Sequence, residues 1–266
     1  MLYIVLSIFA VICLYPVFFT LTSSLKNNTE IFTEPFSLPR TPQWENYVRA
    51  WTIGKMGVYF KNSIILTAAT LFVSAIIGSM ASYILAKYTF KGKSFVYILF
   101  LAGMVIPIQT VIIPLAFTFG KLGIVDNFPV LVLLYSAFCL SMTVFIVTGY
   151  MKGLPDELEE AAVMDGAGHG IVFFRIILPL SMPAIASASI FNFVSAWNNL
   201  LFPLVFISKD SMKTISIGLL SFFGAYTSDY GAVMAAIGVS IIPPIIMYIL
   251  LQEKMEKGLT AGAVKG

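Results

Sequence analysis

Six long stretches of the chain contain no Asp, Glu, Lys, Arg or His; they cover residues 1–25, 62–86, 94–120, 127–151, 176–208 and 230–252. A bilayer core about 30 Å thick requires about 20 apolar residues per helix, so each stretch can hold one spanning helix. Backbone polar groups in hydrocarbon must be satisfied within the segment, which favours helices, and the alternating segments of a transmembrane barrel are not visible. The pattern predicts an all-α integral membrane protein with six transmembrane helices, at about 1–22, 63–86, 94–118, 128–150, 181–207 and 231–251.

The composition agrees with lipid as the solvent of most of the chain. Of its 266 residues, 59% are hydrophobic and 11% are charged, whereas soluble domains carry about a quarter charged residues. The net charge of +3 is small and the Lys and Arg residues are scattered, which excludes a nucleic-acid-binding surface. Cys13 and Cys139 lie in apolar runs, and neither a disulfide framework nor a metal site is indicated.

The charges of the loops bear on orientation. An even number of spans places both termini on one side, and each side then carries eight Lys and Arg residues. Three lysines fall within residues 87–93, and the positive-inside rule weighs short loops most, so the termini are predicted to be cytoplasmic. No basic residue precedes Lys26, so the first run is an uncleaved helix rather than a signal peptide. It starts at Met1 without a polar lead-in, and we expect native residues ahead of it.

One loop, residues 152–178, is rich in acids. Pro155 suits the first position of a helix, and four carboxylates follow near the positive end of the helix dipole. Gly166 is the expected stop, because the residue after a helix often needs a left-handed conformation. A second short helix is predicted from Gly168 to Ile177. On physical grounds alone the loop is either a solvated connection or a docking element outside the membrane.

The spacing within this loop carries a resemblance. Glu160-Ala161-Ala162, then Gly166 after three residues, Ile176 after nine more, and Leu178-Pro179 match the EAA motif of permease subunits of binding-protein-dependent ABC importers without a gap. The resemblance implies the type I ABC importer permease fold. It also implies a cytoplasmic loop that docks on the ATPase subunit, with six candidate coupling residues: Glu159, Glu160, Ala161, Ala162, Asp165 and Gly166.

Further segments resemble the carbohydrate-uptake members, of the maltose-permease type. They are Ile106-Pro107-Ile108-Gln109, Ala196-Trp197-Asn198-Asn199 and the ending Gly258–Gly266. The chain departs from the pattern at Asn199, where many members carry an acid. By resemblance, the C-terminal tail, residues 253–266, reaches between the ATPase subunits and contacts them through Thr260, Lys265 and Gly266.

The resemblance also implies what surrounds the chain. Residues 1–266 would form one transmembrane permease domain in a bacterial plasma membrane, translocating a sugar or oligosaccharide. The implied partners are a second homologous permease subunit, two ATPase subunits, an extracytoplasmic sugar-binding protein and membrane lipid. No cofactor is expected on the chain itself, since ATP and magnesium belong to the ATPase subunits. Gly92-Lys93-Ser94 is not a phosphate-binding loop, because Lys87 stands where the first glycine is required.

Polar residues of the fifth stretch are candidates for the substrate pathway. Ser189, Asn192, Ser195 and Asn199 recur at intervals of three, three and four and so share one helical face. Amides at membrane depth must face protein or water, so this stripe either contacts substrate or bonds neighbouring helices. Trp197 and Asn198 lie beside it, and Gln109 lies between Pro107 and Pro114, where a kink is expected. The small residues of 62–86 predict a helix-packing seam, formed by Thr67, Thr70, Ser74, Gly78 and Ser82.

Three rival functions make different demands on the sequence. A secondary carrier needs ionisable groups inside the membrane, and the six runs contain none. An intramembrane enzyme needs a nucleophile with a base, or a metal constellation, which is also missing; the single histidine, His169, fits an exposed helix residue. A permease of the same fold for a non-sugar substrate remains open.

Overall fold

The described chain is helical. The computed structural model describes the backbone of residues 1–225 and 229–263, and side chains over these ranges except 221, 223–225 and 254–263. These residues include no strand, which confirms the predicted all-α fold. The chain divides into two compact units, one of Met1–Ser63 with Lys209–Pro243 and one of Ile64–Ser208 with Pro244–Gly266.

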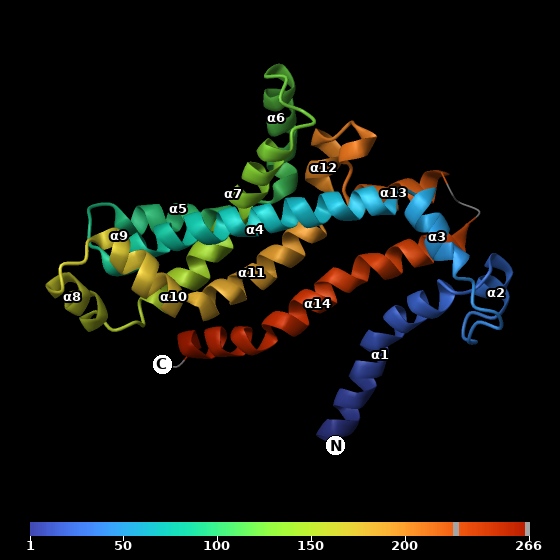
Figure 1. The fold of residues 1–266 in the computed structure, drawn as a ribbon, viewed down its shortest axis with the longest axis horizontal. Coiled ribbons are helices and arrows are strands. Elements are labelled where there is room, and N and C mark those ends of the chain that lie inside the picture. Colours follow the sequence, from blue (N-terminus) through green and yellow to red (C-terminus); the bar gives the residue numbers. More distant parts are fainter. Residues whose placement is uncertain (226–228, 264–266) are drawn as a thin grey trace. The chain divides into compact units, whose positions relative to one another are not determined.

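The first unit combines the N-terminal helices with a later segment of the chain (Figure 1). The helix α1 exposes large apolar side chains along its length, as a lipid-facing helix does. A capping box starts α2, because Asn27 Oδ1 accepts from the Glu30 amide while the Glu30 carboxylate accepts from the Asn27 amide. The elements are α1 (Leu2–Ser23), α2 (Asn28–Thr33), α3 (Glu45–Thr52), the start of α4 (Met56–Lys87), η2 (Asp210–Met212), α13 (Ile215–Ala225) and the first part of α14 (Tyr230–Ala263).

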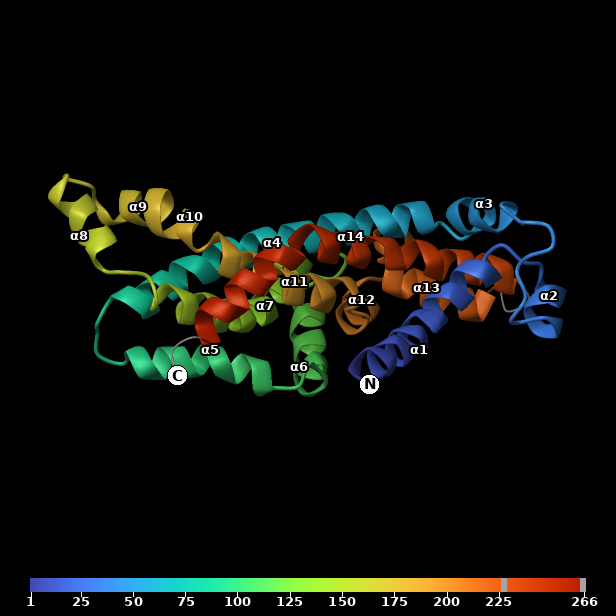
Figure 2. The same cartoon turned by 90° about the horizontal axis from the view of Figure 1, so that it is seen from below.

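The second unit is built around α7, which packs against α5 and α11 (Figures 1 and 2). A Cβ atom at Gly78 of α4 would lie 2.5 Å from Thr143 Cγ2 of α7, so the small-residue face of α4 is the packing seam that the sequence predicts. Besides the rest of α4, the elements are α5 (Lys93–Val105), α6 (Ile108–Lys121), α7 (Phe128–Met151), α8 (Glu157–Met164), α9 (His169–Val172), the π-helix η1 (Phe173–Ile177), α10 (Leu178–Leu180), α11 (Met182–Trp197) and α12 (Leu201–Phe206).

Four described helices are long and apolar enough to cross a membrane, namely α1, α4, α7 and α14 up to Glu253. The number rises to as many as six if each of two bent helix pairs counts as one span. The third predicted span, 94–118, is one of these pairs rather than a single helix: α5 and α6 meet at 96°. The break falls at Ile106 and Pro107, both extended, because proline disfavours the helical conformation of the preceding residue and offers no N–H to Gly103.

The fifth predicted span, 181–207, is also interrupted. Helix α11 ends at Trp197 and α12 begins only at Leu201. The bent pair that can cross the membrane joins α9–α10 to α11 at 70°, so it starts at His169, earlier than predicted. Polar asparagines at 198 and 199 end α11, and Pro203 lies in the short α12, where a missing N–H costs least near the helix start.

The C-terminal region is helical as far as Ala263. Helix α14 continues from Tyr230 to Ala263, well beyond residue 251, and Thr260 belongs to its helical backbone. Residues 251–263 are mostly Leu, Gln, Glu, Lys, Met and Ala, which favour helices even outside the membrane. Lys265 and Gly266 lie outside the described residues, as does the side chain of Thr260.

Candidate functional site

The acidic segment, residues 152–178, contains a capped helix. Helix α8 begins at Glu157 after the N-terminal cap residue Asp156, so Pro155 lies two positions ahead of the helix rather than at its first position as predicted. Glu157, Glu159 and Glu160 occupy the first turn, where the helix dipole favours carboxylates.

The end of α8 follows the sequence prediction. Gly166 has a φ of +83°, which confirms its left-handed conformation. Its N–H donates to the Val163 carbonyl and the Ala167 N–H donates to the Ala162 carbonyl, both at 2.9 Å. This pair of bonds is the Schellman motif, which satisfies carbonyls that the helix end would leave unpaired. Ala162 and Ala167 also pack against the buried core beneath the segment.

Two side chains near the end of α4 hold α8 in place. Lys87 Nζ donates to Asp156 Oδ1 and to the Leu154 carbonyl, both at 2.6 Å, and lies 3.9 Å from Glu159 Oε1. The Lys87 side chain is only 5% exposed. Tyr83 Oη donates to Glu159 Oε2 at 2.8 Å. The hydrogen bond and charge of Lys87 lower the pKa of Asp156 below its usual value, so the Asp156 carboxyl group is ionised at neutral pH.

The hydrogen bonds continue to the second short helix. Tyr83 and Tyr88 share a bond of 3.2 Å between their hydroxyls, and the Tyr88 hydroxyl lies 2.8 Å from His169 Nδ1. The Tyr83 ring also contacts Phe173, with centroids 5.2 Å apart. His169 is exposed, as predicted from the sequence, but its tyrosine partner was not anticipated.

The predicted coupling residues therefore divide between two sides of α8. Glu160, Ala161, Asp165 and Gly166 are exposed, whereas Ala162 is half-buried and the Glu159 side chain is 17% exposed and turned toward α4. Exposed apolar side chains accompany Glu160, with Met164 89% exposed. An outer face of this kind, apolar with a carboxylate, suits insertion into a cleft of another protein. Sequence reasoning missed the contacts of Lys87 and Tyr83, since nothing in the sequence places the end of α4 beside α8.

A cavity of about 350 Å³ lies within the second unit. The α5–α6 break forms one wall, and α7, α11 and the start of α12 form the others. Its lining includes three members of the predicted polar stripe, Asn192, Ser195 and Asn199, together with Phe138 and Phe202. Among the described side chains that line it, the predicted pathway residues Gln109, Trp197 and Asn198 do not appear. Trp197 is buried instead, with its ring stacked on Phe193 at 5.8 Å because it points off the stripe.

The polar groups of the cavity have different partners. Asn192, 4% exposed, donates from Nδ2 to Thr143 Oγ1 at 2.8 Å, so it both bonds a neighbouring helix and lines the cavity. Asn199 Oδ1 accepts from the Phe202 amide at 3.1 Å and thereby positions α12. The buried hydroxyl of Tyr135 lacks a hydrogen-bond partner among the described residues. A buried hydroxyl normally has a hydrogen-bond partner, so within this cavity the Tyr135 hydroxyl is the group that calls for a bound ligand or water. Sequence reasoning did not identify it.

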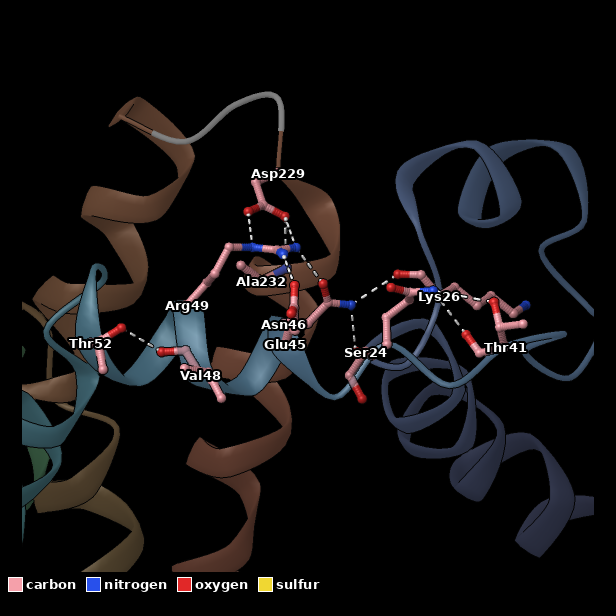
Figure 3. Close-up of polar contacts among 11 residues, drawn as sticks. Ser24, Lys26, Thr41, Glu45, Asn46, Val48, Arg49, Thr52, Asp229 and Ala232 are labelled. Carbon is pink, nitrogen blue, oxygen red and sulfur yellow. Dashed lines mark hydrogen bonds and ion pairs between the residues drawn. The ribbon is translucent and has the colours of Figure 1, made fainter.

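The first unit holds a separate polar network (Figure 3). Buried Asn46 donates from Nδ2 to the carbonyls of Ser24 and Lys26, at 2.8 and 2.9 Å. Arg49 Nε donates to Asp229 Oδ2 at 2.9 Å, and Asp229 also accepts from the Ala232 amide at the start of α14. The network therefore fixes the first loop to α3 and to α14 within this unit, which indicates a structural role.

Comparison with known proteins extends these observations. The family described as "Binding-protein-dependent transport system inner membrane component" matches residues 75–261. The chain is 35% identical to the diacetylchitobiose uptake system permease protein NgcG of Streptomyces coelicolor, over 98% of this chain and 87% of that protein. It is 33% identical to the multiple sugar-binding transport system permease protein MsmG of Streptococcus mutans, over 99% and 96%.

A third relative and a solved structure are also similar to this chain. The probable starch degradation products transport system permease protein AmyC of Thermoanaerobacterium thermosulfurigenes is 34% identical, over 94% of this chain and 91% of that protein. A crystal structure of a bacterial ABC transporter involved in the import of the acidic polysaccharide alginate superposes with a TM-score of 0.80 at 24% identity, covering 94% of each chain. At that identity the likeness shows a shared fold.

Proposed function

This chain belongs to the family of binding-protein-dependent transport system inner membrane components, and we propose that it is the subunit of an ATP-driven importer through which a sugar or oligosaccharide crosses the membrane. Membership makes the chain a multi-pass transport permease rather than an enzyme. The exposed outer face of α8, with Glu160 beside a Schellman-capped helix end, is the observation that carries the proposal.

A sugar as cargo is supported by two independent observations. The relatives bear names of sugar uptake systems, among them diacetylchitobiose and starch products. The cavity also combines the groups that bind sugars: amides of Asn192 and Asn199, a free tyrosine hydroxyl and phenylalanine rings. Hydroxyl-rich ligands require several such partners, since each buried polar group left unpaired costs binding energy.

The proposed assembly contains more chains than this one. Two ATPase subunits, which bind ATP and magnesium, would receive the exposed face of α8, and the end of α14 with residues 260–266 would contact them. A second, similar permease subunit completes the pathway, and an extracytoplasmic binding protein delivers the sugar. This arrangement places both termini in the cytoplasm of a bacterium, in agreement with the lysines at 87–93.

Transport then follows from a change between two states. Closure of the ATPase subunits moves α8, and the cavity opens toward the opposite side of the membrane. The loaded binding protein favours one state by binding it more tightly, which couples delivery of the sugar to ATP hydrolysis. For this chain the requirement is that motion at α8 reaches the helices that line the cavity.

Reconstitution tests the proposal directly. The permease pair, its ATPase and its binding protein are placed in proteoliposomes, and uptake of labelled chito-, gluco- and arabino-oligosaccharides is measured with amino acids as a control panel. We expect ATP-dependent uptake of one oligosaccharide class. Uptake that persists with a hydrolysis-dead ATPase and collapses with an ionophore would indicate a secondary carrier, and uptake of amino acids alone would exclude a sugar permease.

A further inference from the structure

Besides the Tyr88–His169 bond and the packing of Ala162 and Ala167, the acidic segment is held to the rest of the second unit by four polar side chains. On α4 these are Tyr83 and Lys87, which lie four residues apart and so share a face. On the segment they are Asp156 and Glu159, at the start of α8. We call these four residues the α4–α8 clamp.

The covalent connections of α8 are poor candidates for transmitting force. Gly153 lies in the turn that leads from α7 to α8, and Gly166 and Gly168 lie in the connection from α8 to α9. Glycine leaves a backbone flexible. A helix joined on both sides through glycines follows its neighbours only where side chains hold it; Ala162 packs α8 against the core, and the clamp supplies the polar contacts.

The geometry of the clamp makes it stiff. Lys87 is nearly inaccessible to solvent, so its ammonium group depends on the Asp156 carboxylate and the Leu154 carbonyl for compensation. Tyr83 has its ring packed on Phe173 and its hydroxyl on Glu159, so it cannot turn away without losing both contacts. Both ends of the clamp are therefore fixed, one in the core and one on the first turn of α8.

We propose that Lys87 and Tyr83 are positioning residues that join α8 to α4, so that movement imposed on the outer face of α8 is passed to α4. Glu159 then contacts α4 within the permease, whereas its neighbour Glu160 lies on the exposed face of α8 that meets the other protein. The inference rests on the proposed function, because it assumes that another protein moves α8. It predicts that loss of the clamp separates ATP hydrolysis from transport.

The test uses four variants in the full reconstituted complex. Lys87→Met removes the buried charge, Lys87→Arg retains it, and Tyr83→Phe removes a single hydroxyl with little risk to folding. Lys91→Met is the matched control, because Lys91 is an exposed lysine four residues along the chain. For each complex we would measure co-purification of the ATPase, hydrolysis stimulated by the loaded binding protein, and sugar transported per ATP.

A structural readout accompanies these rates. Spin labels at Ile84 on α4 and Val163 on α8, both exposed, report the distance between the helices in a complex otherwise free of cysteine. In Lys87→Met we expect the ATPase to co-purify normally, the distance distribution to widen at least twofold, and sugar per ATP to fall at least threefold. Tyr83→Phe should show smaller changes in the same direction, and Lys87→Arg and Lys91→Met should resemble the parent.

The outcomes separate the inference from the proposed function. An unchanged distance distribution in Lys87→Met and Tyr83→Phe would overturn the clamp while leaving transport by the parent intact. A wider distribution with sugar per ATP unchanged would show that the contacts are structural only. A parent complex without stimulated hydrolysis would instead contradict the proposed function.

Discussion

Asn192 Nδ2 lies 2.8 Å from Thr143 Oγ1, so α11 and α7 share a buried hydrogen bond at the wall of the cavity. The sequence left open whether Asn192 faces sugar or a neighbouring helix, and the geometry allows both. Such bonds between membrane helices contribute about 0.6 kcal/mol on average.

A double-mutant cycle therefore measures this bond. We expect Asn192→Ala and Thr143→Val each to destabilise the folded state, with a coupling free energy of about 0.6 kcal/mol in denaturant unfolding in detergent. Ser195→Ala, at an exposed position lining the same cavity, is the control. Strictly additive effects would show that the bond contributes nothing to stability.

The Tyr135 hydroxyl predicts a complementary result. Because the described residues give it no partner, Tyr135→Phe should leave unfolding unchanged. If sugar occupies the cavity, one lost hydrogen bond of about 1 kcal/mol should raise the half-saturating sugar concentration roughly fivefold. Uptake kinetics check this, and an unaltered half-saturation value would exclude Tyr135 from substrate contact.

Gly166 provides a test of the helix stop. A side chain meets no atom within 4 Å there, so the cost of Gly166→Ala is the left-handed backbone itself, about 1–2 kcal/mol. We expect normal membrane insertion but at least a threefold loss of stimulated ATP hydrolysis, since a ΔΔG of 1 kcal/mol shifts an equilibrium about fivefold. Gly168→Ala is the matched control, with equal space and a φ of −74°. Equal behaviour of the two variants would show that the stop is dispensable.

Gly78 reports on the α4–α7 seam. In Gly78→Ala the new methyl group would lie 2.5 Å from Thr143 Cγ2, closer than carbon atoms approach without movement. Overpacking of this kind costs about 1–3 kcal/mol. Thermal unfolding of the purified subunit should show a lower Tm for Gly78→Ala, whereas Gly149→Ala, with nothing within 4 Å, should match the parent. A parent-like Tm in both would mean that the helices separate freely.

The carboxylate of Asp210 makes the stability of the first unit depend on pH. It accepts hydrogen bonds from Lys55 and Tyr59 and pairs with Lys213, and these contacts hold its pKa well below the usual range. A lowered pKa stabilises the fold above the unfolded pKa and loses that effect as pH falls through the folded one. Because the pairs are partly exposed, Asp210→Asn should cost only about 0.5 kcal/mol at pH 7.

Unfolding measured against pH checks the sign of this effect. The difference between parent and Asp210→Asn should be constant from pH 8 to 5 and shrink only below about pH 4. A difference that disappears between pH 7 and 6 would indicate that another group titrates.

The membrane-spanning stretches and the end of α8 can be predicted from the sequence, because membrane burial and helix ends depend on local chemistry. Charge-free runs identify the spans, since a charge in hydrocarbon is costly wherever it occurs. The left-handed Gly166 is likewise predictable, because the stop follows from the absence of a Cβ atom. The exposure of Glu160 is predictable too, because the EAA motif that contains it implies a docking surface.

The features that sequence reasoning missed depend on tertiary contacts. Glu159 and Glu160 cannot be distinguished by their sequence positions alone. Glu159 faces Tyr83 and Lys87 only because α4 lies on that side of α8. Trp197 was a candidate for the substrate pathway, but it points off the polar stripe and is buried against Phe193. The bend in the third span, by contrast, was expected from the sequence, because Pro107 and Pro114 predict a kink between them and α5 and α6 meet at 96°.

That break changes what the cavity can recognise. Pro107 leaves the Gly103 carbonyl without its usual helical donor, and Gly103, Met104 and Ile106 all line the cavity. Main-chain oxygen atoms at this depth remain able to accept hydrogen bonds from hydroxyl groups. Gly103 thus brings a carbonyl without a helical donor to a part of the lining where the side chains of Met104, Ile106 and Ile108 are apolar. An inventory of side chains alone therefore undercounts the hydrogen-bond acceptors among the residues that line the cavity.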